Sequence, residues 1–338
     1  MRVFAFILFS FFLSAAHAQK WIKLADFPEP AEELLGASAG GKMYVFCGLA
    51  PGWKPMGLVY EYDPASDKWA KKSPMPLPSH HVSFTEHKGK IYAFGGFVLP
   101  QSGPPAWVAI DNAWEFDPAA DSWKALAPMP TKRGSPVAVS AGDKIYVIGG
   151  AVPGPGQPAV HPARPHTSVS TVEEYDPATN TWRARTGMPT PRNHMVAGAI
   201  NGKVYVASGR VGAAFISGGS SNVGVVEAYD PASDSWSQGL ARMPNARSAG
   251  AGGVWNGKLY VTGGEYQDPG MMATLRSFEA YDPATNTWQS LPPMPVSRHG
   301  LAGAVVGNTI HMVSGDVQSA GTGVHVHTPE HDAFEFMK

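Results

Sequence analysis

A segment that occurs six times restricts the fold of this chain more than any other feature of its sequence. Each copy begins with Met-Pro, or with Phe-Pro in the first copy, and reaches a dipeptide of small residues, most often Gly-Gly, 20 residues later. The paired positions are Phe27 and Cys47, Met75 and Gly95, Met129 and Gly149, Met188 and Ser208, Met243 and Gly263, and Met294 and Ser314. Six equal intervals without an insertion indicate one supersecondary unit that stacks on copies of itself.

A second element follows each of the first five segments, with a Trp seven residues after an aromatic residue. These pairs are Tyr62 and Trp69, Phe116 and Trp123, Tyr175 and Trp182, Tyr229 and Trp236, and Tyr281 and Trp288. The sixth copy is divided, because "AFEF" (333–336) lies near the end of the chain and Trp21 near its start. A chain that completes its last unit with its first residues must close into a circle.

Each unit is predicted to contain four antiparallel strands. The turns "NGK" and "GDK" favour tight hairpins that need positive φ, and "DPATN" and "DPASD" place Pro after a capping Asp. We expect the Gly-Gly dipeptides to let an aromatic side chain of a neighbouring unit approach the backbone. The interval from the second strand to the third varies between 15 and 26 residues, so insertions gather on one face. We call this face, with its Met-Pro corners, the mouth, and expect binding there.

The paired glycines, the aromatic residue before Trp and the Met-Pro-x-x-Arg stretch ("MPTPR", "MPNAR", "MPVSR") resemble the Kelch repeat. The likeness covers nearly all of residues 19–338. It implies an all-β fold: a six-bladed β-propeller of four-stranded Kelch blades, closed by an N-terminal strand. Three first positions of the dipeptide depart from glycine, namely Cys47, Ser208 and Ser314, but all are small. We expect Cys47 to be a buried structural thiol.

The first residues predict export. Residues 1–18 have a basic start, an apolar run and "AHA" before the expected cleavage point, which is typical of a signal peptide. The expected mature chain, 19–338, is then a single propeller domain in the periplasm or outside the cell, without a membrane span. Without Arg2 it carries 25 Lys and Arg against 27 Asp and Glu. That balance gives no reason to expect nucleic acid as a partner.

An arginine stands four residues after Met in the last four units. These residues are Arg133, Arg192, Arg247 and Arg298. Guanidinium groups around a mouth can bind a carboxylate, sulfate or phosphate. The alternative, which we prefer, is a structural role in which they pair with acids of the next blade or with loop carbonyls. Glu265 and Asp316 are available acids, and Arg210 occupies the equivalent place in the fourth unit.

Histidines follow at the next two positions of the same corners. His81 and His194 share one position, and His80 and His299 share the one before it, with Asn193 beside His194. A histidine there can act as a general acid or base, but no carboxylate is adjacent in sequence, so recognition or a structural role is preferred. The candidate ligand-binding residues are therefore His81, Arg133, Arg192, Asn193, His194, Arg210, Arg247, Glu265, Arg298 and His299.

Two further groups of residues in the loops leave their roles open. His325 and His327 alternate along "GVHVHTPEHDAF", and with His331 they can in principle bind a transition metal. Their spacing matches no closed zinc motif, so we assign no metal and no cofactor. Aromatic residues of the loops can either stack on a partner or fold down over the blades. They are Trp53, Trp107, Phe215 and Tyr266.

These patterns favour a binding module over an enzyme, and no catalytic residue is assigned. The expected partner is a protein or a glycan, including a small anionic sugar, held at the mouth. The alternative is a small carbohydrate-active enzyme, because periplasmic sialic-acid epimerases (mutarotases) are six-bladed Kelch proteins. Membership of a fold family does not by itself transfer an activity.

Overall fold

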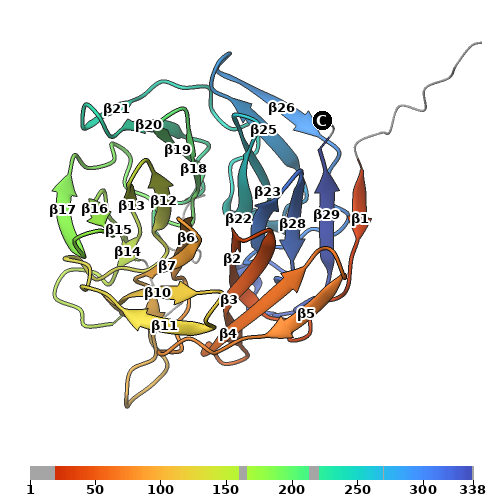
Figure 1. The fold of residues 1–338 in the computed structure, drawn as a ribbon, viewed down its shortest axis with the longest axis horizontal. Coiled ribbons are helices and arrows are strands. Elements are labelled where there is room, and N and C mark those ends of the chain that lie inside the picture. Colours follow the sequence, from red (N-terminus) through yellow and green to blue (C-terminus); the bar gives the residue numbers. More distant parts are fainter. Residues whose placement is uncertain (1–19, 160–165, 213–220, 269, 337–338) are drawn as a thin grey trace, which may run out of the picture.

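The computed structural model describes residues 20–159, 166–212, 221–268 and 270–336. Six antiparallel sheets stand around a central axis like the blades of a propeller, which confirms the predicted fold (Figure 1). The expected signal peptide lies outside the described residues. Among the described residues, no helix has the length and apolar character needed to cross a membrane.

The blades follow one another along the chain, each with its first strand at the axis. Blade 1 has β2 (Glu32–Ala39), β3 (Lys42–Ala50), β4 (Lys54–Asp63) and β5 (Lys68–Lys71). Blade 2 has β6 (Ser83–His87), β7 (Lys90–Phe94), β10 (Ala113–Asp117) and β11 (Ser122–Ala125). Blade 3 has β12 (Val137–Ala141), β13 (Lys144–Ile148), β16 (Val172–Asp176) and β17 (Thr181–Arg185).

Blades 4 to 6 repeat this order. Blade 4 has β18 (Val196–Ile200), β19 (Lys203–Ala207), β20 (Val226–Asp230) and β21 (Ser235–Ser237). Blade 5 has β22 (Ser248–Trp255), β23 (Lys258–Asp268), β25 (Phe278–Asp282) and β26 (Thr287–Leu291). Blade 6 has β27 (Ala302–Val306), β28 (Thr309–Val313), β29 (His331–Glu335) and β1 (Trp21–Lys23). The loops carry β8 (Phe97–Val98), β9 (Val108–Ala109), β14 (Ala151–Val152), β15 (Thr167–Ser168), β24 (Met271–Thr274) and the 3-10 helix η1 (Ala320–Thr322).

Strand β1 closes the circle, as the divided sixth unit predicts. It pairs with β29, so that Trp21 lies opposite Phe334 and Ile22 opposite Ala333. The indole of Trp21 packs against Phe278 and Phe334, with ring centroids 5.3 and 5.4 Å away. The first residues of the described chain therefore supply the outer strand of the last blade.

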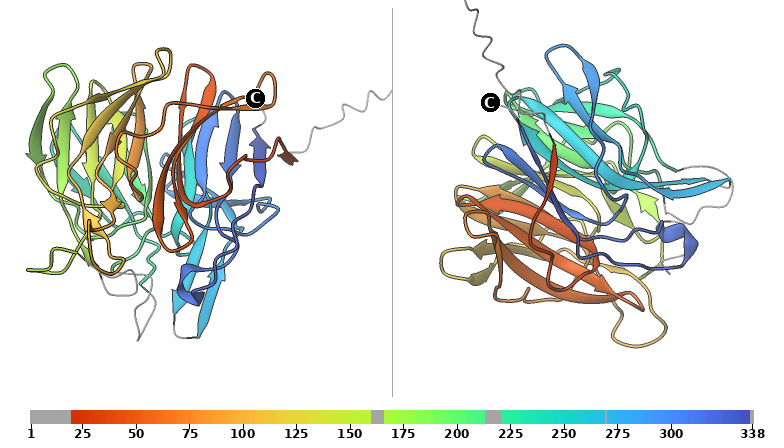
Figure 2. Two further views of the ribbon diagram at one scale, coloured as in Figure 1. Left: turned by 90° about the horizontal axis from the view of Figure 1, so that it is seen from below. Right: turned by 90° about the vertical axis from the view of Figure 1, so that its right-hand side faces the viewer.

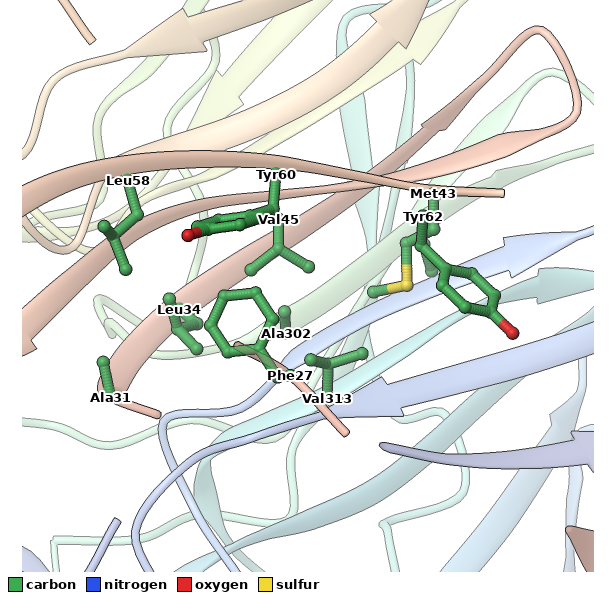
Figure 3. Close-up of a cluster of buried hydrophobic side chains, with 11 residues drawn as sticks. Phe27, Ala31, Leu34, Met43, Val45, Leu58, Tyr60, Tyr62, Ala302 and Val313 are labelled. Carbon is green, nitrogen blue, oxygen red and sulfur yellow. The ribbon is translucent and has the colours of Figure 1, made fainter. Parts of the chain in front are cut away.

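The apolar core lies between the faces of neighbouring blades. Figure 3 shows one such layer, where Phe27, Val45 and Tyr60 of the first unit meet Ala302 and Val313 of blade 6. Cys47 is fully buried, as expected, and burial raises the pKa of its thiol. Near the axis the first strands come so close that a Cβ on Gly36 would lie 2.5 Å from the carbonyl oxygen of Gly303.

The recurring Trp ties each blade to the connection that precedes it. The indole N–H donates to a backbone carbonyl of that connection, as Trp182 does to Ala127 and Trp288 to Ala241. An Asp or Asn five residues after the recurring aromatic accepts a hydrogen bond from the same connection. These residues are Asp67, Asp121, Asn180, Asp234 and Asn286. The segment from the recurring aromatic residue to the Trp thus joins each blade to the one before it by hydrogen bonds.

The Gly-Gly dipeptides accommodate a backbone carbonyl rather than the expected aromatic side chain. The second glycine donates its N–H to the carbonyl of the corner arginine of the next blade, as Gly96 does to Arg133 and Gly150 to Arg192. A Cβ on Gly95 would lie 2.4 Å from that Arg133 oxygen. The expectation of an aromatic neighbour was wrong at this position, because the corner of the next blade already fills the space.

Candidate functional site

The four corner arginines lie inside the blades. Each is fully buried and forms an ion pair with an acid on the third strand of its own blade. The pairs are Arg133 with Glu173, Arg192 with Glu227, Arg247 with Glu279, and Arg298 with Asp332. An N–H of each arginine also donates to a carbonyl of the second strand, as Arg192 does to Val206 at 3.0 Å. Burial and pairing favour the structural interpretation of this ring.

The expected acid partners of this ring were wrong. Glu265 pairs with Arg210, and Asp316 with His325, because both acids follow the dipeptide and point into the mouth. The true partners were visible in the sequence. An acid stands two residues before the recurring aromatic in blades 3 to 6, whereas blades 1 and 2, which have no corner arginine, have Tyr60 and Trp114 there.

Six corner residues form a ring around the axis, each two residues after the position of the corner arginine. All have a left-handed backbone, with φ between 51° and 59°. They are Glu33, His81, Ser135, His194, Ala249 and Gly300. Backbone hydrogen bonds join consecutive members from His81 to Gly300, for example from His194 N–H to the Ser135 carbonyl. Blades 1 to 4 therefore place polar side chains at the axis, and blades 5 and 6 leave space beside them.

This ring surrounds a cavity of about 60 Å³ on the axis. Glu33 Oε2 lies 3.3 Å from His81 Nε2, and the rings of His81 and His194 meet edge to face. Asn193 Oδ1 accepts from His194 Nδ1 at 2.5 Å, and Arg210 Nη2 donates to His194 Nε2 at 3.0 Å. His194 is therefore held as a neutral imidazole with its proton on Nδ1.

The electrostatics of the cavity favour proton exchange near neutral pH. Burial, with the neighbouring charge of Glu32, raises the pKa of Glu33 to about 7. Burial also holds the pKa of His81 and His194 well below the ordinary histidine value, and Arg210 adds to the effect on His194. A carboxyl group poised near pH 7 beside neutral imidazoles has the properties of a general acid or base.

A chain of alternating charges continues from the cavity across blades 4, 5, 6 and 1. Arg210 Nη1 lies 2.8 Å from Glu265 Oε1, and the other Glu265 oxygen accepts from Gln267, Ser319 and the Ala320 N–H. His299 Nε2 lies 3.8 Å from both Glu265 and Glu32. Burial opposes protonation of His299, but the surrounding acids outweigh it and raise its pKa.

Trp107 covers the blade 2 side of the mouth. Its indole is buried and packs on His80, His81 and His166, with ring centroids 4.9 to 5.1 Å away. Of the two roles considered for the loop aromatics, Trp107 folds down over the blades. Trp53 and Tyr266 are half-buried, and Phe215 lies outside the described residues.

The three C-terminal histidines separate. His325 and His327 lie on one side of an extended segment that pairs with Asp316, as their alternation predicts. His331 is instead buried in the core of blade 6, where its Nε2 lies 3.0 Å from His311 Nδ1 and its ring packs on Tyr62. Its separation from the other two removes it from any shared metal site.

Exposed apolar side chains gather on the loops of blades 4 to 6. In the described part of the chain all five exposed large apolar residues are there, and we call them the apolar rim: Val211, Met271, Met272, Val324 and Val326. The hairpin of β23 and β24 extends from the same face as the segment with η1 (Figure 2). The hairpin and this segment touch, since a Cβ on Gly321 would lie 2.9 Å from Met272 Sδ.

Comparison with known proteins identifies the repeat. The Kelch motif family matches residues 78–130, 132–189, 191–239 and 246–295, which is more than half of the chain. Kelch-like protein terF of Aspergillus terreus is 28% identical over 64% of this chain and 45% of its own length. Human Kelch-like protein 23 is 27% identical over 81% of this chain and 44% of its own length. The chain thus spans under half the length of these curated relatives.

A solved structure has the same architecture. The structure titled "Structure of YjhT" superimposes with a TM-score of 0.70 at 16% identity, covering 91% of this chain and 95% of that one. At this level of identity the likeness concerns the fold alone.

Proposed function

Because the chain belongs to the Kelch family of β-propellers, we propose that it is a binding module that holds a protein partner on the apolar rim of its mouth. Kelch propellers generally act as protein-interaction modules. One observation supports this placement: every exposed large apolar side chain of the described residues lies on loops of blades 4 to 6. Exposed apolar groups that cluster on one face typically mark an interaction site.

The chemistry of the rim indicates the kind of partner. Flexible, polarisable Met side chains adapt to different apolar surfaces, and Val side chains add apolar area beside them. Arg210, Glu265 and Asp316 lie behind the rim, buried and paired, so they stabilise the loops that present it. We further propose, from the signal-like residues 1–18, that this binding takes place in the periplasm or outside the cell.

Site-specific crosslinking tests this function. A photoreactive amino acid at Met271 is expected to capture a protein in the producing cells, whereas the same group at Lys88, on the opposite face, is expected not to. With the purified partner, Met271→Glu combined with Met272→Glu should weaken binding at least about tenfold, because two apolar contacts are lost. Calorimetry measures the affinity, and Lys88→Glu is the control. Equal capture from both faces would contradict the proposal.

The axial cavity favours the second candidate, a carbohydrate-active isomerase. Glu33, His81 and His194 can exchange protons there, and Arg210 can orient an anionic group. A cavity of about 60 Å³ is much smaller than the roughly 300 Å³ that small-molecule sites need, so Trp107 would have to move. This size difference is the reason that we rank the enzyme second.

The variant Glu33→Gln tests the isomerase and leaves the apolar rim unchanged. The amide keeps the shape of the side chain but cannot exchange a proton. If the protein interconverts the anomers of an acidic sugar, this variant should slow the reaction by about 10²-fold or more. The rate can be followed by NMR, with Glu86→Gln as a control away from the mouth. If the unchanged protein did not speed the interconversion above its rate without protein, this candidate would be eliminated.

A further inference from the structure

Four side chains meet across the seam between the last blade and the first. Glu32 comes from β2 of blade 1, whereas Asp316, His325 and His327 come from the loop of blade 6. One donor atom of each lies within 4.8 Å of the others. The seam is the place where the circle closes, so these residues are distant in sequence and adjacent only in the folded protein.

The distances from His325 to the two acids are close to those in a metal coordination shell. His325 Nδ1 lies 3.1 Å from Glu32 Oε1 and 3.1 Å from Asp316 Oδ2. Ligands bound tetrahedrally at about 2.0 to 2.1 Å from Zn²⁺ lie about 3.3 Å from one another. Both distances from His325 Nδ1 are therefore within a few tenths of an ångström of this value, and the two acid oxygens lie within 4.8 Å of each other. His327, held by the backbone bridge between its own position and Asp316, is the fourth donor.

Two observations independent of this spacing point to a ligand-binding role for the group. His327 Nε2 is buried and has no hydrogen-bond partner among the described residues. His299, fully buried beside the group, has no hydrogen-bond partner on either ring nitrogen, and its Nε2 lies 3.8 Å from Glu32. Buried polar atoms without partners are uncommon and call for an explanation such as an ion.

We propose that Glu32, Asp316, His325 and His327 bind one Zn²⁺ ion across the seam between blades 6 and 1. Two carboxylates balance the charge of a divalent cation, and two imidazoles favour zinc over the hard cations Mg²⁺ and Ca²⁺. The ion replaces the proton that His325 otherwise shares with the two acids, and this proton leaves to water.

The ion would fix one part of the apolar rim. Val324 and Val326 alternate with His325 and His327 along the same extended segment, so the valines are exposed while the histidines face the seam. Zinc at this place would hold the segment on blade 1 and join the last blade to the first at the mouth, in addition to β1, which closes the circle at the outer edge of blade 6. The inference stands independently of the proposed partner, because its test needs the protein and the metal alone.

Calorimetric titration of the EDTA-treated full chain with ZnCl₂ tests the site. The expected result is one equivalent of Zn²⁺ with a micromolar or lower dissociation constant, and a higher midpoint of thermal unfolding. Co²⁺ in the same protein should give the intense visible absorption of a tetrahedral site. His325→Ala and His327→Ala should each weaken binding on the order of 100-fold, since each removes one of four ligands.

His87→Ala, a histidine variant on the opposite face, is the matched control and should bind as the unchanged protein does. Circular dichroism of the two loop variants verifies that their sheets are intact. No binding by the unchanged chain would overturn the proposal. Binding that survives both loop variants, or that falls equally in His87→Ala, would also overturn it, because the ion would then lie elsewhere.

Discussion

Replacement of Arg192 by Met is expected to lower the free energy of unfolding by about 3 to 5 kcal/mol. Glu227 is 3% exposed and would remain as a buried charge without its partner. The carbonyls of Thr190, Val206 and Ser208 would lose their donor as well. Chemical denaturation monitored by Trp fluorescence measures this change.

The double variant Arg192→Met with Glu227→Leu separates charge burial from packing. It should recover much of the lost stability, because a buried ion pair can be replaced by apolar side chains at little net cost. Lys203→Met is the surface control: Lys203 pairs with Asp230 at 3.4 Å in an exposed position, so its loss should cost at most about 1 kcal/mol. If Arg192→Met changed the free energy of unfolding only slightly, the structural role would be contradicted and Arg192 would remain a candidate ligand-binding residue.

Deletion of residues 20–23 is the second change with a large expected effect. It removes β1, exposes the edge of β29 and takes Trp21 and Ile22 from their contacts. Loss of two apolar side chains should lower the free energy of unfolding by about 3 to 6 kcal/mol. The free edge should also promote association between chains.

Calorimetry and light scattering measure these two effects of the deletion. Lys23→Ala keeps the strand and loses only exposed ion pairs with Asp26 and Glu330, so it should cost about 1 kcal/mol or less. If the deletion were as stable as Lys23→Ala and remained monomeric, the N-terminal strand would not be what closes the propeller.

The mouth shows where prediction from the sequence reached its limit. The positions of His81 and His194 at one place in their corners were correct, because the repeat sets that place. The acid that pairs with each arginine was not predicted. An acid stands two residues before the recurring aromatic only in the four blades that also have a corner arginine. The corner and the acid belong to different segments of the unit, and the ion pair joins them across 32 to 40 residues of chain.

The difference between the two halves of the mouth was even harder to predict from the sequence. The residue after the dipeptide is apolar in the first three blades (Leu49, Phe97 and Ala151) and charged in the last three (Arg210, Glu265 and Asp316). This contrast acquires a meaning only when the blades form a circle, since Glu32 then lies beside His325 and Glu33 beside His81. Their sequence separations gave no reason to consider them together.

The sequence by itself determined the number of blades, their strand order, the turns and the closure by the N-terminal strand. These features depend on local intervals that repeat, and a repeated interval can be read without coordinates. Only the tertiary structure decided which polar groups are buried, which are paired and which meet across the seam. Those properties depend on long-range contacts between different blades, where one carboxylate or imidazole changes the pKa and the partners of the next.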